Sequence, residues 1–155
     1  MEFLNYAAVS IIAFSGLFCG AMLAFVSPEE MKPGRRHFEA MIKTVFIAIP
    51  SLMVFFLGRD NLLLSAVFIL LCIAFVFYSN KRFIYPLLGI FFYISARDAG
   101  LFPIIAGLIF ILGLAKGTIF AHEHEGMKKT RILRKILICH AFFLLISLPL
   151  FFSDL

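Results

Sequence analysis

Six apolar stretches, separated by short polar gaps, occupy most of this chain of 155 residues. They cover residues 4–26, 40–57, 62–78, 83–96, 101–120 and 136–152. A helix needs about 20 apolar residues, each rising about 1.5 Å, to cross roughly 30 Å of hydrocarbon. Apolar residues make up 63% of the chain, well above the roughly half found in soluble domains. The sequence therefore predicts an all-α integral membrane protein, a compact bundle of six transmembrane helices that forms a single domain over residues 1–155.

The basic residues are distributed unevenly over the gaps between these stretches. Of 14 Lys and Arg residues, all except Arg59 and Arg97 lie in or beside alternate gaps. Cytoplasmic loops of membrane proteins are enriched in Lys and Arg. We therefore expect a multi-pass protein of the cell membrane, with loops 27–39, 79–82 and 121–135 in the cytoplasm and both termini outside.

The net charge of +5 follows from this orientation and does not indicate a nucleic-acid partner. The cations are dispersed over three loops and lack interleaved aromatic residues on which bases would stack. The predicted partner is the lipid bilayer. The gaps leave no room for a soluble catalytic domain, so any chemistry must lie in the bundle or in the two longest loops. The cysteines are isolated within apolar stretches and predict packing residues, and no cofactor is expected.

Two segments with a common pattern predict a repeated hairpin. Residues 50–56 (PSLMVFF) and 86–92 (PLLGIFF) share Pro-x-Leu-x-(Val or Ile)-Phe-Phe, and each is followed by an Arg-Asp pair. Both copies run in the same direction, so this would be a parallel repeat, unlike the inverted repeats of many transporters. Chance similarity in a sequence rich in phenylalanine is the other explanation.

The two Arg-Asp pairs, Arg59-Asp60 and Arg97-Asp98, allow two interpretations. In the first, the aspartates cap the helices that follow and the arginines bind lipid phosphates. In the second, the pairs lie beneath the outer surface, because the apolar runs before them are only about 21 Å long as helices, and they form a polar outer vestibule that binds substrate. His140, about 7 Å into the membrane beyond Lys135, is either bonded to a nearby carbonyl or part of this substrate path as a proton relay.

The two longest loops carry residues that bind metals in other proteins. His122 and His124 lie in loop 121–135, and Glu30 and His37 lie in loop 27–39, on the same expected side of the membrane. Together they supply enough ligands for a metal ion, provided that the two loops meet. The alternative is a solvated loop of mixed charge.

Loop 27–39 also contains a helix-start signal. Ser27 is followed by Pro28 and, three residues on, by Glu30, an arrangement typical of a capping box with proline at the first helical position. We expect one short helical turn here, ending before Pro33-Gly34.

Small residues recur every fourth position in two of the apolar stretches. These are Gly16, Gly20 and Ala24 in the first and Gly113 and Gly117 in the fifth. Such spacing lets two helix backbones approach closely in lipid. The neighbour is either another helix of the same chain or a second chain, so a homo-oligomer and a membrane partner subunit both stay open.

Three classes of function fit these features. The first is a transporter, a channel or a membrane-embedded substrate-binding subunit, with a small solute or ion in the polar outer vestibule. In size and in its small-residue first helix the chain is similar to the substrate-binding subunits of certain vitamin uptake systems, which implies transport. The second is a non-enzymatic assembly or sensor component that acts through helix–helix contacts. The third is a metal-dependent lipid enzyme at the cytoplasmic face. We expect the first class and do not expect an enzyme.

Overall fold

The computed structural model describes residues 3–57 and 84–152, apart from the side chains of residues 30–32, 57, 84 and 152. All regular structure in these residues is helical: α1 (Phe3–Val26), α2 (Pro28–Leu57), α4 (Ile84–Ser95), α5 (Leu101–Glu123), α6 (Lys129–His140) and α7 (Phe142–Phe152). The expected span 62–78, together with Arg59, Asp60 and Cys72, lies outside the described residues.

Three of these helices are long and apolar enough to cross a membrane: α1, the Pro33–Phe56 part of α2, and α5. The pair α6 and α7, bent by 42° at a short break, makes a fourth span if it is counted as one. Helix α4 is apolar but has only 12 residues. The described part of the chain thus has the helices of a membrane protein, while six spans and the placement of both termini outside stay predictions.

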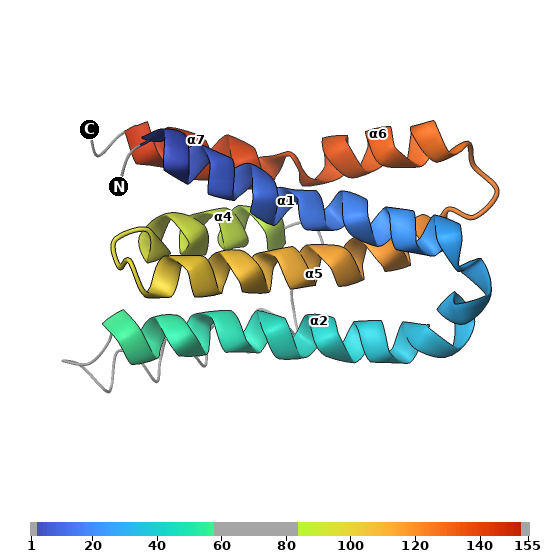
Figure 1. Ribbon diagram of the computed structural model, residues 1–155, viewed down its shortest axis with the longest axis horizontal. Helices are drawn as coiled ribbons and strands as arrows, with labels where there is room; N and C mark the ends of the chain where they lie inside the picture. Colours follow the sequence, from blue (N-terminus) through green and yellow to red (C-terminus); the bar gives the residue numbers. More distant parts are fainter. Residues whose placement is uncertain (1–2, 58–83, 153–155) are drawn as a thin grey trace.

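The helices run roughly along one common axis (Figure 1). Helices α6 and α7 follow one edge in this view, α2 follows the other, and α1, α4 and α5 lie between them. The α1–α2 junction and the α5–α6 loop share one end of the bundle, which we call the basic end because it carries segments 27–39 and 121–135. The α4–α5 turn, the start of α1 and the end of α7 share the opposite end, where the rings of Phe3 and Phe151 lie 5.9 Å apart.

Two expected loops are largely helical. Helix α2 begins at Pro28, as the capping signal indicates, but continues through Pro33 and Gly34 to Leu57, so the prediction of a single turn was wrong. A proline this close to a helix start removes only one backbone hydrogen bond, and an Arg35–Glu39 ion pair of 2.9 Å supports the adjoining turn. Loop 121–135 shortens to residues 124–128 because α5 and α6 extend into it.

Among the described helices, α1 and α5 pack most closely. A Cβ atom on Gly20 would overlap the carbonyl oxygen of Leu114, and one on Gly117 would overlap that of Leu17. Gly16 and Gly113 lie in the same contact. The Thr118 hydroxyl reaches across to the Gly20 carbonyl oxygen at 3.0 Å. The neighbour of each small-residue stripe is therefore a helix of the same chain, and Ala24 is buried as well.

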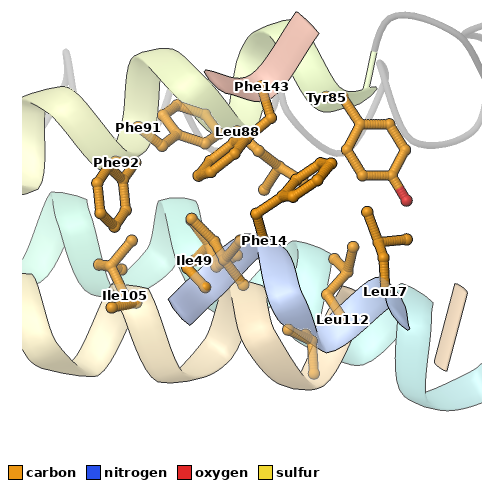
Figure 2. Packing of buried hydrophobic residues seen from close by; sticks show 14 of the residues in the cluster. Phe14, Leu17, Ile49, Tyr85, Leu88, Phe91, Phe92, Ile105, Leu112 and Phe143 are labelled. Carbon is orange, nitrogen blue, oxygen red and sulfur yellow. The ribbon is translucent and has the colours of Figure 1, made fainter. Parts of the chain in front are cut away.

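Aromatic rings fill the half of the bundle nearer the opposite end. The Tyr6 ring lies 5.2 Å from that of Phe92 and 4.5 Å from that of Phe151, and Phe92 lies 4.9 Å from Phe102 and 5.5 Å from Phe143. Figure 2 shows Phe92, Phe143 and Phe14 among the aliphatic side chains of α2, α4 and α5. The Tyr6 hydroxyl donates to the Ser147 carbonyl oxygen at 3.0 Å. This half therefore has a densely packed interior.

The two copies of the proposed repeat pack differently although α2 and α4 run in the same direction (Figure 1). Phe55 in the first copy is 73% exposed, whereas its counterpart Phe91 is 1% exposed. Pro50 lies inside α2, while Pro86 lies in the first turn of α4, where no N–H is needed. The shared pattern therefore gives no shared packing role.

The orientation in the membrane can be tested by labelling cysteines introduced into a variant that lacks Cys19, Cys72 and Cys139. A cysteine beside Asp154 is expected to react with an impermeant thiol reagent added outside intact cells, because the positive-inside rule places the C-terminus there. A cysteine beside Lys129 is expected to react only after the cells are opened. The reverse labelling pattern would contradict the predicted orientation.

Candidate functional site

Of the buried polar residues that the structure describes, His140 lies at the break between α6 and α7. Helix α6 ends at His140 and α7 begins at Phe142. Backbone hydrogen bonds continue across the bend, from the Ala141 N–H to the Leu137 oxygen and from the Leu145 N–H to the Ala141 oxygen, both 2.9 Å. The bend thus reorients the helix while the backbone groups on both sides stay paired, as hydrocarbon requires.

His140 is buried at this break and lies among aromatic rings. Its Nδ1 atom is 2.8 Å from the Ile136 carbonyl oxygen. Because a carbonyl oxygen only accepts, Nδ1 carries the proton, and Nε2 of the neutral ring is then a proton acceptor. The Tyr85 ring stands edge-on at 4.2 Å and the Phe120 ring at 5.7 Å. The structure thus contains the predicted bond to a nearby carbonyl, and a relay role for Nε2 stays a prediction.

Tyr85, at the start of α4, brings a hydroxyl group into the same region. The side chain is buried, and its hydroxyl forms no hydrogen bond with any residue that the structure describes. Figure 2 shows the ring at one end of the hydrophobic cluster, with the hydroxyl directed toward Leu17. A buried hydroxyl without a partner costs about 1 to 3 kcal/mol. This cost makes the Tyr85 hydroxyl a strong candidate to contact water, an ion or a solute.

Lys116, on α5, is the third polar residue of this region. It is half-buried and lies about 10 Å along the helix from Glu123, the last residue of α5. It precedes Phe120 by one helical turn, and the Phe120 ring is 5.7 Å from that of His140. Charged side chains within membrane spans are costly and mark ion and proton paths. We call Tyr85, Lys116 and His140 the polar site.

Sequence reasoning identified only His140 of these three residues. The uneven distribution of basic residues groups Lys116 with loop 121–135, although it stands inside the apolar stretch 101–120. A lysine surrounded by apolar residues on both sides was the signal that could have separated it from the loop. Tyr85 had no such signal, because an interfacial tyrosine is common in membrane proteins.

The Arg97-Asp98 pair lies in the α4–α5 turn at the opposite end. One carboxylate oxygen of Asp98 accepts hydrogen bonds from the N–H groups of Gly100 at 2.8 Å and Leu101 at 2.9 Å. Asp98 thus holds the start of α5, as the capping interpretation proposes. Arg97 is exposed, with its guanidinium group 5.9 Å from the Tyr93 ring centre. A vestibule shared with Arg59 and Asp60 stays a prediction.

The residues predicted to bind a metal lie at the basic end. Their side chains contact other groups or do not come together. His122 Nδ1 is 3.4 Å from a Glu125 carboxylate oxygen, and His124 Nδ1 is 2.9 Å from the Phe120 carbonyl oxygen. His37 is exposed on α2, and the Glu30 side chain is not described. The ends of α2 and α5 do meet, through an Arg35–Glu123 pair of 3.4 Å. Within residues 3–57 and 84–152, no three His, Cys, Asp or Glu side chains are grouped to hold a metal.

The basic end also contains a hollow of about 180 Å³ between the end of α1, the end of α5 and the start of α6. Ala24, Ala121 and Ile132 are among its lining residues. The Lys129 ammonium group lies nearby, 5.3 Å from the centre of the Phe25 ring. The hollow is smaller than the roughly 300 to 1,000 Å³ of typical small-molecule pockets.

No protein-family model matches this chain, and no curated protein and no solved structure is significantly similar to it.

Proposed function

We propose that this protein is a small proton-coupled membrane transporter, and that a small anion is bound and released at the polar site. The observation that carries this proposal is the contact of His140 with Tyr85, whose hydroxyl has no hydrogen-bond partner among the described residues, and the half-buried Lys116 on the neighbouring helix α5. Membrane proteins rarely keep such groups within a span unless the groups bind or conduct something. The break between α6 and α7 supports the same proposal, because transporter sites are commonly built at interrupted helices.

The chemistry of the polar site favours an anion that travels together with a proton. Lys116 supplies a positive charge, and His140 becomes a second one when Nε2 takes up a proton. Two such charges repel each other strongly where water is scarce. A small anion between them offsets this repulsion, and the Tyr85 hydroxyl donates a hydrogen bond to it. Anion and proton therefore stabilise each other's binding, so that the two are taken up together.

The site proposed here differs in place from the expected outer vestibule. It lies at the α6–α7 break, near the middle of the bundle's length in Figure 1, whereas the α4–α5 turn, which carries Arg97 and Asp98, lies at the opposite end. In our proposal the Arg-Asp pairs belong to the entrance from the opposite end, and the bend at Ala141 is the point about which α7 moves when access changes sides. The proposed mechanism makes the polar site, and not the entrance, responsible for coupling.

Transport can be measured with purified protein in liposomes that contain a pH-sensitive dye. With the wild-type protein, adding formate, lactate or nitrate outside at pH 6 is expected to acidify the interior faster than in protein-free liposomes, for at least one anion. His140→Phe and Lys116→Met are expected to slow this acidification at least about tenfold, because each removes one charge of the polar site. Tyr85→Phe, which removes only the hydroxyl, is expected to weaken the apparent affinity for the anion.

His124→Phe is the matched control, because His124 lies in the α5–α6 loop and its Nδ1 faces a backbone oxygen. This variant is expected to transport at the wild-type rate. The proposal fails if no tested anion acidifies the liposomes, or if His140→Phe and Lys116→Met fold and transport like the wild type.

A second candidate function is that of an assembly component, which the surface of α2 favours. A smaller share of α2 is buried than of α1 or α5, and its exposed residues include Phe55. Such a surface faces either lipid or a second chain. Efficient disulfide cross-linking of Phe55→Cys in native membranes, together with a lack of transport, would favour this function over the transporter.

A further inference from the structure

The outward surface of α6 changes character along the helix. Lys129, Arg131 and Arg134 are exposed in its first half, whereas Leu137, Ile138 and Cys139 are exposed in its second half. The inward face is continuous and is formed by Ile132, Ile136 and His140. The outer face therefore passes from cationic to apolar between Arg134 and Leu137, within one helical turn.

The cations of α6 and its N-cap have no anionic partners in the described part of the protein. Lys128, Lys129, Arg131, Arg134 and Lys135 form no ion pair with a described residue, and the sequence contains no Asp or Glu between Glu125 and Asp154. Arg35 of α2, in contrast, pairs with both Glu39 and Glu123. The surface of α6 thus carries a positive charge that no described residue neutralises through an ion pair.

We infer that the first half of α6 binds the phosphate groups of anionic phospholipids in the leaflet that contacts the basic end of the bundle. The exposed Leu137 and Ile138 then contact the acyl chains of the same lipids. Arginine suits this role because its planar guanidinium group donates paired hydrogen bonds to phosphate oxygens. This inference goes beyond the proposed transport function and does not depend on it.

The change from cations to apolar side chains within one turn selects this partner. A nucleic acid or an acidic peptide would match the charge of Arg131 and Arg134 but would leave Leu137 and Ile138 in water. In an anionic lipid the phosphate group is followed directly by hydrocarbon. Along α6, cations are likewise followed by apolar side chains within one turn. The charge and the apolar surface of α6 are therefore both satisfied by one ligand.

Lipid binding can be measured by thermal unfolding of the purified full chain in a nonionic detergent at several lipid concentrations. A ligand at free concentration L that binds the folded state stabilises it by RT ln(1 + L/Kd), from which the apparent Kd is obtained. Phosphatidylglycerol is expected to raise the midpoint and phosphatidylcholine is not. In Arg131→Gln/Arg134→Gln, the apparent affinity for phosphatidylglycerol is expected to fall about 30-fold, given that each surface Lys or Arg contributes about a factor of five. Added NaCl is expected to weaken the effect in the wild type.

Arg36→Gln/Lys43→Gln is the matched control, since it removes the same charge from exposed positions of α2. It is expected to lower the affinity less than Arg131→Gln/Arg134→Gln does, because Arg36 and Lys43 are seven residues, about 10 Å, apart along α2 and do not share one phosphate group. The charge-preserving variant Arg131→Lys/Arg134→Lys is expected to keep most of the affinity. Equal stabilisation by both lipids, equal losses in the two Gln double variants, or the same stabilisation by soluble glycerol phosphate would each overturn the inference.

Discussion

Replacing Gly20 or Gly117 by leucine is expected to separate α1 from α5 and to destabilise the bundle. The expected loss is about 3 kcal/mol or more, the upper end of the usual range of about 1 to 3 kcal/mol for overpacked cores. The reason is that even a Cβ atom at either position would overlap a backbone carbonyl group of the facing helix, Leu114 for Gly20 and Leu17 for Gly117. A flexible side chain can move aside, but a helix backbone moves only with its whole helix. Moving α1 away also removes the reach of the Thr118 hydroxyl to the Gly20 oxygen.

The matched control lies on the same helix. Gly107 is exposed on α5, and a Cβ there would meet no atom within 4 Å. Gly107→Leu is expected to leave stability unchanged or to raise it by up to about 1 kcal/mol through helix propensity. Thermal unfolding of the three variants in one detergent would measure the difference. A Gly117→Leu protein as stable as Gly107→Leu would show that α1 and α5 do not approach as closely as described.

Phe143→Ala is expected to lower the free energy of unfolding by about 2 to 3 kcal/mol. This is no more than the smallest losses measured for Phe→Ala in the cores of soluble proteins. Phe143 is buried between the rings of Phe14 at 6.4 Å and Phe92 at 5.5 Å. Removing it leaves a cavity in the aromatic half of the bundle, and the lost dispersion contacts are not recovered in lipid. The cost is lower than in water because the hydrophobic effect contributes little between helices that are already in a membrane.

Phe142→Ala removes the same side chain from the adjacent position, which is 55% exposed on the outer face of α7. It is expected to cost less than about 0.5 kcal/mol, because surface substitutions away from packed features have small effects. The two variants have the same amino-acid composition, so a difference between their unfolding midpoints in one detergent reports only on how α7 packs. Equal losses for Phe142→Ala and Phe143→Ala would mean that α7 presents a different face to the bundle.

The helix bounds of the most apolar segments were predictable because they depend on local interactions. Stretch 4–26 corresponds to α1 (Phe3–Val26), and stretch 101–120 corresponds to the first part of α5 (Leu101–Glu123). An apolar run in hydrocarbon must pair its own N–H and C=O groups, and a helix is the only way for a single segment to do so. The cap that Asp98 provides for α5 is equally local, because the carboxylate and the two N–H groups lie within three residues.

The polar segments were less predictable because their conformation depends on tertiary contacts. Pro33-Gly34 indicated a helix end, but α2 passes through both residues, and the pairing of Arg35 with Glu123 connects this part of α2 to α5. The break at Ala141 had no signal in the sequence, since the bend occurs without a proline or glycine. In both places local sequence preferences do not decide the conformation, and a contact with another helix is present: Arg35 with Glu123, and His140 with Tyr85.

Sequence alone determined that the chain forms apolar helices, that its cations lie in alternate gaps, and that two helices carry surfaces of small residues suited to close approach. Only the tertiary structure decided that these two surfaces face each other, that Phe91 is buried while its sequence counterpart Phe55 is exposed, and that the rings of Tyr85 and His140 are in contact. The physical reason is range: helix formation depends on neighbours within about four residues, whereas the choice of facing surfaces depends on packing between segments far apart in the chain.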